Sequence, residues 1–285
     1  MASMRDIKRR KESVQSTQQI TKAMKLVSTV KLQRAKILAE NAKPYFDKMF
    51  ATVTSILEKT GQISHPYLTS NGSDKKAVIV ISGNRGLAGG YNSNIIKAVM
   101  EEGLKPEHTL VYGVGRKGIE FLSRRGYKIA EDDSEMIDEP LFEDAAALGK
   151  SVLNAYRDGE VGEIYLAYTR FKNTVVHEPT VIKLLPVEFS EAQLEEGRKT
   201  APMNFEPAPE EALDLIVPKY VNSLIYGAFM ESVASENGAR MQAMDSATNN
   251  ADEMISSLSL AYNRARQGAI TQELTEIISG SEAIS

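Results

Sequence analysis

The chain of 285 residues contains no cysteine. This absence excludes disulfide bonds and thiol catalysis, and it is compatible with a reducing compartment. No run approaches 18 consecutive apolar residues, so we expect no membrane-spanning helix and no membrane insertion. The first residues, MASMRDIKRRKESVQ, have no apolar stretch after their basic residues, which argues against a secretory signal.

Aromatic residues are also absent from residues 1–44. Proteins that hold single-stranded nucleic acid use aromatic rings as stacking platforms, so we expect no nucleic-acid partner. The charge is uneven: residues 1–36 carry ten Lys or Arg against Asp6 and Glu12, in a chain of net charge -4, whereas residues 131–144 carry eight acids and no base. The basic segment is either a solvated helix face or a surface that meets an acidic protein.

Residues 3–59 contain no glycine and one proline, Pro44. They predict one long helix of roughly 85 Å at about 1.5 Å per residue, with a kink possible at Pro44. No compact domain of this size needs such a helix for its core. A heptad frame with several polar interruptions is expected to form its seam: Ile7, Val14, Met24, Ala35, Leu38, Ala42, Tyr45, Met49 and Ile56.

The C-terminal stretch predicts a second long helix, which begins near Pro209 and runs to the C-terminus. Apolar residues step through it by three and four, so we expect a seam against one partner helix. After Ala265 this frame fails at Gly268 and Gln272, and a new apolar stripe begins. The expected seam is Met244, Ala247, Ala251, Met254, Leu258, Ala261 and Ala265, and the new stripe is Ile270, Leu274 and Ile277.

The middle of the chain alternates strand and helix patterns, which predicts an α/β domain with a mostly parallel, Rossmann-like sheet. Strands are expected at 76–82, 109–114, 127–131, 163–171 and 178–189, and a loop at 190–208. The fold class is therefore an α/β insert domain on a long antiparallel two-helix coiled coil formed by the N- and C-terminal helices. The expected domains are residues 1–60, 74–208 and 209–285.

Two segments resemble nucleotide-binding motifs. Gly113, Gly115 and Gly118 form a G-x-G-x-x-G pattern between a strand and a helix, with Asp132 and Asp133 about 20 residues further on. A lone match is weak, and the glycines also suit a tight strand–helix junction. The run Gly149-Lys150-Ser151 ends like a phosphate-binding loop, but it lacks the first glycine and lies in a helical pattern, so we reject that interpretation.

A third segment, the turn with Gly83, Gly86, Gly89 and Gly90, could bind an anion at a helix N-terminus or could be contacted by another protein. His65, His108 and His177 have no partner at metal-ligand spacing, so no metal site is expected. No catalytic set converges, and we expect neither a cofactor nor catalysis by this chain.

Three runs together resemble the γ subunit of F-type ATP synthases. They are RRKESVQSTQQITKAMKLVSTVKLQRA (9–35), SGNRGLAGGYN (82–92) and ARQGAITQELTEIISGS (265–281). The resemblance spans the chain and implies a central rotor stalk that couples ion-driven rotation to ATP synthesis or hydrolysis without catalysing it. It implies a peripheral location at the cytoplasmic face of a bacterial membrane.

The resemblance also implies partners: α and β subunits at a 3:3:1 ratio, an ε subunit and the membrane c ring. It assigns contacts with the α/β hexamer to seven residues, Met24, Lys25, Arg264, Arg266, Gln267, Thr271 and Glu273. It assigns contacts at the foot to Arg85, Gly86, Gly89 and Gly90. The alternatives left open are a dinucleotide-dependent oxidoreductase and a coiled-coil tether or nucleic-acid binder.

Overall fold

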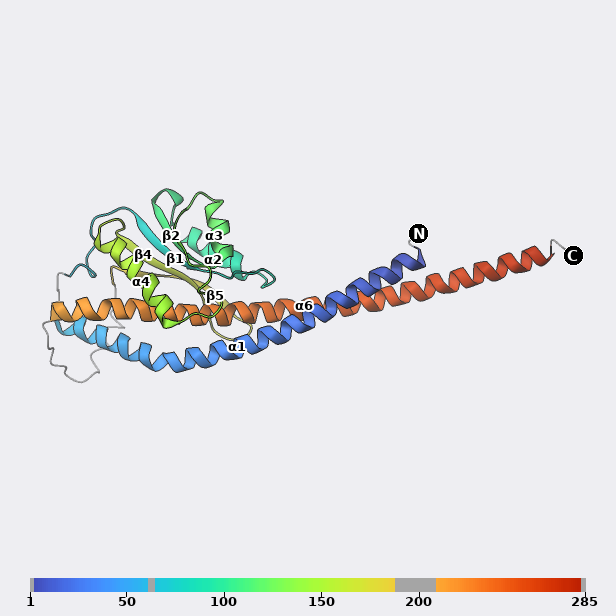
Figure 1. Cartoon of the computed structure of the whole chain (residues 1–285), viewed down its shortest axis with the longest axis horizontal. Coiled ribbons are helices and arrows are strands. Elements are labelled where there is room, and N and C mark those ends of the chain that lie inside the picture. The colour runs from blue at the N-terminus through green and yellow to red at the C-terminus, as the bar shows by residue number, and fades with distance from the viewer. Residues whose placement is uncertain (1–2, 61–64, 188–208, 283–285) are drawn as a thin grey trace. The chain divides into compact units, whose positions relative to one another are not determined.

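The computed structural model describes residues 3–60, 65–187 and 209–282. Along the chain, one long helix precedes a five-stranded α/β fold and a second long helix follows it (Figure 1). The helices are α1 (Met4–Thr60), α2 (Tyr91–Glu101), α3 (Arg116–Ser123), α4 (Phe142–Arg157) and α6 (Pro209–Glu282), with a short 3₁₀ helix at Pro106–His108. The strands are β1 (Lys76–Ile81), β2 (Thr109–Val114), β3 (Lys128–Asp132), β4 (Glu163–Phe171) and β5 (His177–Leu185).

The sheet has the order β3-β2-β1-β4-β5. All neighbouring pairs are parallel except β4 and β5, which are antiparallel. The mostly parallel α/β fold predicted from the sequence is confirmed. The predicted last strand is too long: β5 ends at Leu185, directly before Pro186, which has no N–H to donate to a ladder. Residues 188–189 of that prediction and the loop expected at 190–208 lie outside the described residues.

Helices cover both faces of the sheet. In β1, Val78 and Val80 face a buried cluster with α2 and α3, while Ala77, Ile79 and Ile81 face a second cluster with α4, α6 and the end of α1. A strand buried on both faces reads as a continuous apolar run, and this explains the sequence KAVIVI.

The residues form two compact units. The terminal helix pair is Met1–Ser28 with Met241–Ser285, and the sheet unit is Thr29–Arg240. Both long helices contribute to both units. The three-domain division expected from the sequence stays a prediction.

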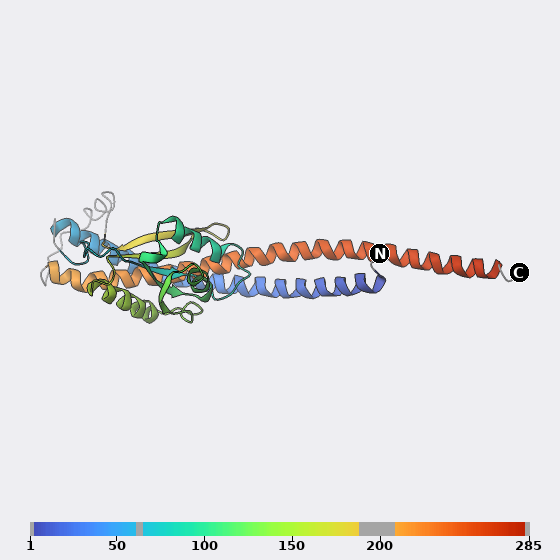
Figure 2. The same cartoon turned by 90° about the horizontal axis from the view of Figure 1, so that it is seen from above.

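Within the terminal helix pair, α1 and α6 lie side by side and run antiparallel (Figures 1 and 2). The direction follows from the contacts, because Gln18 meets Asp252, Thr21 meets Thr248 and Lys25 meets Asp245. The two-helix coiled coil predicted from the sequence is confirmed.

The predicted seams of α1 and α6 are partly wrong. On α6, Met244 and Ala251 are buried as expected, but Thr248 is buried in place of Ala247, and Met254 is 42% exposed. On α1, Leu32 is buried and Leu38 is 48% exposed. At Thr248 the seam position lies one residue later than predicted, because a search for apolar residues passes over a buried threonine.

Candidate functional site

The seam of the terminal helix pair contains buried polar residues beside the apolar Met244 and Ala251. The hydroxyl oxygens of Thr21 and Thr248 are 2.7 Å apart and buried, and Lys25 Nζ lies 2.6 Å from Asp245 Oδ1. Polar residues at seam positions specify helix register at a cost in stability. Lys25, assigned to partner contact, is therefore engaged within the pair, and its neighbour Met24 is half-buried.

The apolar residues of α1 in this unit lie on the outside. Ile20, Leu26 and Val27 are 57%, 68% and 58% exposed. A contiguous exposed apolar surface marks an interaction site more often than a solvent-facing one. The exposed apolar residues of α1 indicate that the pair meets another apolar surface.

The last part of α6 carries the five remaining residues assigned to the hexamer, Arg264, Arg266, Gln267, Thr271 and Glu273, and all are exposed. Here α6 continues past the N-terminal end of α1 (Figure 2). Ile270, Leu274 and Ile277 are 49%, 54% and 69% exposed. The predicted departure of the helix from its partner is confirmed.

The assigned residues line both edges of this apolar stripe. At 3.6 residues per turn, Ile270, Leu274 and Ile277 share one face of the helix. Arg266 and Glu273, seven residues apart, follow one edge of the stripe. Gln267 and Thr271 follow the other edge, with Arg264 seven residues before Thr271. The arrangement is an apolar contact strip with hydrogen-bonding groups along both sides.

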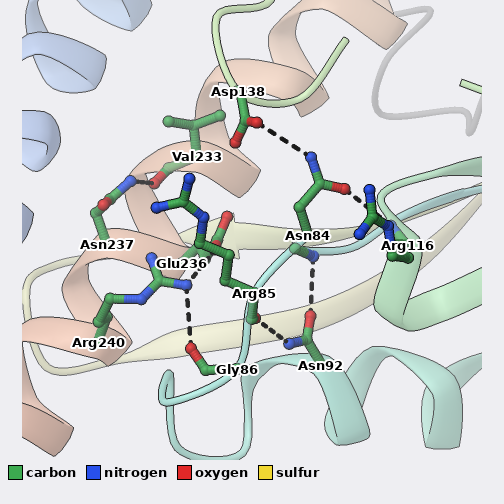
Figure 3. Close-up of polar contacts among 11 residues, drawn as sticks. Asn84, Arg85, Gly86, Asn92, Arg116, Asp138, Val233, Glu236, Asn237 and Arg240 are labelled. Atoms are coloured by element: carbon green, nitrogen blue, oxygen red, sulfur yellow. Dashed lines mark hydrogen bonds and ion pairs between the residues drawn. The ribbon is translucent and has the colours of Figure 1, made fainter. Parts of the chain in front are cut away.

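The loop after β1 carries the four residues assigned to the foot. Arg85, Gly86, Gly89 and Gly90 are all exposed, and Gly89 has a φ of +57°. Side chains from two helices hold its backbone (Figure 3). Asn92 of α2 accepts the Gly83 N–H at 2.8 Å and donates to the Arg85 carbonyl at 3.1 Å.

Arg240 of α6 forms the second attachment of this loop. Its guanidinium donates to the Gly86 carbonyl at 3.4 Å and pairs with Glu236, one turn earlier in the helix. Both side chains of the pair are 12% exposed. A buried ion pair with a further hydrogen bond holds its geometry well. The loop is thus held as a shaped surface.

Leu87, between Gly86 and Gly89 in this loop, was missed by sequence reasoning. It is 65% exposed and has a backbone φ of +62°, a conformation that residues other than glycine rarely adopt. The signal was present in the run GLAGG, where a single large apolar residue stands among glycines. The strained, exposed leucine makes the loop a candidate contact surface.

The G-x-G-x-x-G glycines serve packing. A side chain at Gly115, whose φ is +101°, would overlap the Ser82 carbonyl, and one at Gly118 would lie 2.7 Å from Ser82 Oγ. One at Gly113 would overlap Ile119. The junction interpretation of these glycines is therefore the one that the structure supports.

The N-terminus of α3 already has hydrogen-bond partners. The N–H groups of Arg116, Lys117 and Gly118 donate to Asn84 Oδ1, the Gly83 carbonyl and Ser82 Oγ at 2.8–3.1 Å. A bound phosphate uses these same donors. The N–H groups that an anion would bind at the start of α3 are therefore already used within the protein.

Helix α6 fills the other position where such sheets bind ligands, beyond the carboxyl ends of β1 and β4, where the strand order reverses. Ser235 Oγ donates to the Thr169 carbonyl at 3.0 Å, and a side chain at Gly83 would lie 2.7 Å from Glu236 Oε1. The oxidoreductase alternative therefore lacks its usual crevice.

The remaining candidates are structural. Gly149 lies inside α4, where an added side chain would overlap Asn222 of α6, so the rejected phosphate loop is a helix. His65 is buried and lies 3.4 Å from Asp214. Among the described residues, no group of three or more His, Cys, Asp or Glu could hold a metal ion. In the same residues, we find no helix with the length and apolarity needed to span a membrane.

Relatives from two bacteria match the whole chain. The chain is 68% identical to an ATP synthase gamma chain of Lachnoclostridium phytofermentans, with 100% of both chains covered. It is 41% identical to the "ATP synthase gamma chain, sodium ion specific" of Acetobacterium woodii, with 99% of both covered.

Solved structures show the same fold. The central stalk and c-ring structure of the Tetrahymena thermophila mitochondrial ATP synthase contains a chain that is 26% identical, with a TM-score of 0.57. The match covers 80% of this chain and 99% of that one. A rotor chain of the Euglena gracilis mitochondrial ATP synthase is 18% identical, with a TM-score of 0.65 and coverage of 94% and 98%, and supports the fold alone. A family model described as ATP synthase matches residues 3–284. With this match and the full-length relatives, the chain belongs to the ATP synthase gamma-chain family.

Proposed function

We propose that this chain is the central rotor stalk of an F1Fo ATP synthase. In this role it couples ion-driven rotation of a membrane ring to conformational changes at the nucleotide sites of an α/β hexamer. The observation that carries the proposal is the exposed end of α6, where an apolar stripe is bordered by Arg266 and Glu273 on one side and Gln267 and Thr271 on the other. Family membership supports it.

The chain itself performs no bond chemistry in this proposal. A rotor changes the affinity of a nucleotide site through contacts that differ between its rotational positions. An asymmetric helix pair supplies such contacts, because its faces differ: the exposed residues of α1 in the terminal helix pair include Ile20 and Val27, and those of α6 include the stripe.

The proposed partners of the helix pair are α and β subunits, at three copies each per copy of this chain. Arg264, Arg266, Gln267, Thr271 and Glu273 are proposed to contact the hexamer from α6. Met24 and Lys25 are proposed to contribute from α1. Lys25 then contacts the hexamer while it is paired with Asp245. The side chains of Lys25 and Asp245 are 42% and 49% exposed, so a partner can still reach them.

The loop with Arg85, Gly86, Gly89 and Gly90 is proposed to contact a subunit at the foot, the ε subunit or the c ring. Its attachment to α2 by Asn92 and to α6 by Arg240 supports a surface that transmits force. We place the chain at the cytoplasmic face of a bacterial membrane as a peripheral subunit, in line with its bacterial relatives.

The test uses the assembled complex, with ATP synthesis, ATP hydrolysis and rotation as readouts. We expect deletion of residues 260–285 to reduce ion-driven synthesis strongly. A sharper variant replaces Ile270, Leu274 and Ile277 with Ser. Its control makes the same replacement at Gln272, Thr275 and Glu276, on the opposite side of the same helix segment. We expect the first triple variant to lose coupling and the control to keep it.

Copurification separates loss of coupling from loss of assembly. The proposal requires that the wild-type chain is isolated with two larger nucleotide-binding subunits at a 3:3:1 ratio. Full synthesis by the complex lacking residues 260–285 would show that the end of α6 is not the coupling route.

A further inference from the structure

A cavity of about 980 Å³ lies within the sheet unit, between α1, the start of α4, the β4–β5 pair and α6. Small-molecule sites are typically about 300–1,000 Å³ and mostly apolar with a few polar groups. Two aromatic residues of the lining, Tyr45 and Phe142, are 49% and 41% exposed, so a ligand can reach the cavity from solvent. None of the residues assigned to partner contact lines it.

An aromatic cluster forms one wall of the cavity. The ring of Phe142 lies between those of Tyr45 and Tyr226, with centroid distances of 6.4 and 5.7 Å and near-perpendicular planes. Three different helices therefore meet at this wall. Gly227, the next residue of α6, lines the cavity too, and a side chain added there would meet nothing within 4 Å.

Glu231 of α6 is the distinctive polar group of the lining. Its Oε2 accepts the Phe171 N–H at 3.1 Å, and burial raises the pKa of its carboxyl group, while the Arg170 charge acts in the opposite direction from beyond ion-pair distance. Among the described residues no cation lies within 4.0 Å of it. A partly buried carboxylate without an ion-pair partner costs free energy, and a cation that binds it would lower this cost.

The other charged groups of the lining do not offer Glu231 a partner. Lys172 is paired with Glu178 at 2.6 Å. Lys36 and Glu40 lie one turn apart on α1, a spacing at which opposite charges partly offset each other. The charge available to a ligand inside the cavity is therefore negative, and it lies beside an aromatic wall.

We propose that this cavity binds a small amphipathic organic cation, whose hydrocarbon body packs against Tyr45, Phe142 and Tyr226 and whose ammonium group pairs with Glu231. The aromatic rings contribute to holding such a cation through cation–π attraction. This site is independent of the rotor contacts proposed above, and its test does not use ATP synthesis.

The test exploits the absence of tryptophan from the chain. Phe142→Trp places a single fluorescent reporter at the wall of the cavity in the full-length protein. The probes are 4-phenylbutylamine, 4-phenylbutanoate and 4-phenylbutanol, which share a shape and differ in charge. We expect saturable binding of the amine at least about tenfold tighter than that of either other probe. Equal binding of the three probes, or no saturation by the amine, would overturn the proposal.

Variants locate the two parts of the site. Glu231→Gln keeps the size of the side chain and an acceptor for the Phe171 N–H, and we expect it to weaken amine binding about tenfold with the alcohol unchanged. Gly227→Leu adds a side chain to the cavity wall one turn before Glu231 and should weaken binding of every probe about tenfold. Glu40→Gln, at the exposed rim, is the control and should change amine affinity less than about twofold.

Calorimetry on the chain without the reporter substitution checks the fluorescence result, and circular dichroism confirms that each variant is folded. Amine binding that is unaffected by Glu231→Gln in a folded protein would show that the ammonium group binds elsewhere, and the assignment would fail.

Discussion

The carbonyl oxygen of Ser82, the residue directly after β1, lies only 1.9 Å from the position that a Cβ at Gly115 would take. Gly115 has a φ of +101°, which alone disfavours any residue with a Cβ. The two residues bring the loop after β1 against the start of α3, and this close approach explains the glycine pattern that resembles a dinucleotide-binding motif.

We predict that Gly115→Ala lowers the free energy of unfolding by about 3 kcal/mol or more, because the new methyl group overlaps backbone atoms that cannot move easily. Gly126→Ala is the matched control: Gly126 has a φ of +86° but open space around it, so about 1 kcal/mol is expected. Urea unfolding followed by circular dichroism measures both. Equal costs would show that strain in φ, and not the contact with Ser82, requires the glycine.

The Thr21–Thr248 contact predicts strong coupling between two substitutions. Thr21→Val or Thr248→Val alone removes the cross-helix hydrogen bond, while the remaining hydroxyl keeps its bond to a carbonyl of its own helix, so a cost of about 0.5–1.5 kcal/mol is expected. The double variant should be close to wild type or more stable, because two valines pack at the same positions. A double-mutant cycle on urea unfolding gives the coupling, and simple additivity would contradict the prediction.

Glu163 predicts a dependence of stability on pH. Burial alone would raise the pKa of this carboxyl group, but hydrogen bonds from Lys76, Lys183 and Tyr165 lower it to about 2. The Lys76 and Lys183 ammonium groups lie 2.8 and 3.1 Å away. A lowered folded-state pKa adds stability above the unfolded-state pKa of about 4.3, and this stability is lost as the pH falls toward 2.

We therefore expect Glu163→Gln to remove on the order of 2 kcal/mol of stability at pH 6 and about half as much at pH 3. Urea unfolding at a series of pH values measures the difference between the variant and wild type. The exposed Glu107→Gln is the control, and its effect should be small at every pH. A cost of Glu163→Gln that is the same at pH 6 and pH 3 would contradict the assignment.

The contact between Arg240 and the Gly86 carbonyl predicts that the order of the loop after β1 depends on α6. Arg240→Met removes the donor to the Gly86 carbonyl and leaves the largely buried Glu236 without a cation, so a loss of about 2–4 kcal/mol is expected. Adding Glu236→Gln should restore part of this stability but not the loop attachment. Amide hydrogen exchange at residues 84–90 should be faster in both variants, and unchanged exchange there would show that Asn92 alone holds the loop.

Several features were predictable because they leave local patterns. The run KAVIVI predicts a strand buried on both faces, and the lack of glycine in residues 3–59 predicts the long helix. The seam register was not predictable from apolar spacing. Thr21, Lys25 and Thr248 face the partner helix, whereas Leu26 and Val27 are exposed. The apolar residues of α1 therefore do not mark the seam by themselves.

The glycines illustrate the same limit. The sequence left Gly113, Gly115 and Gly118 open between phosphate binding and packing, and the distances to Ser82 and Ile119 favour packing. Arg240 was not singled out at all, because one arginine in a helix carries no signal about a loop some 150 residues earlier in the chain.

The sequence by itself determined the fold class, the two long helices and the family resemblance, because periodicity and local composition are properties of neighbouring residues. Only the tertiary structure decided which helix faces are inside, why the glycines are needed, and that Glu231 borders a cavity, where its carboxylate accepts the Phe171 N–H. These features depend on contacts between residues far apart in the chain, and such contacts follow from packing in three dimensions.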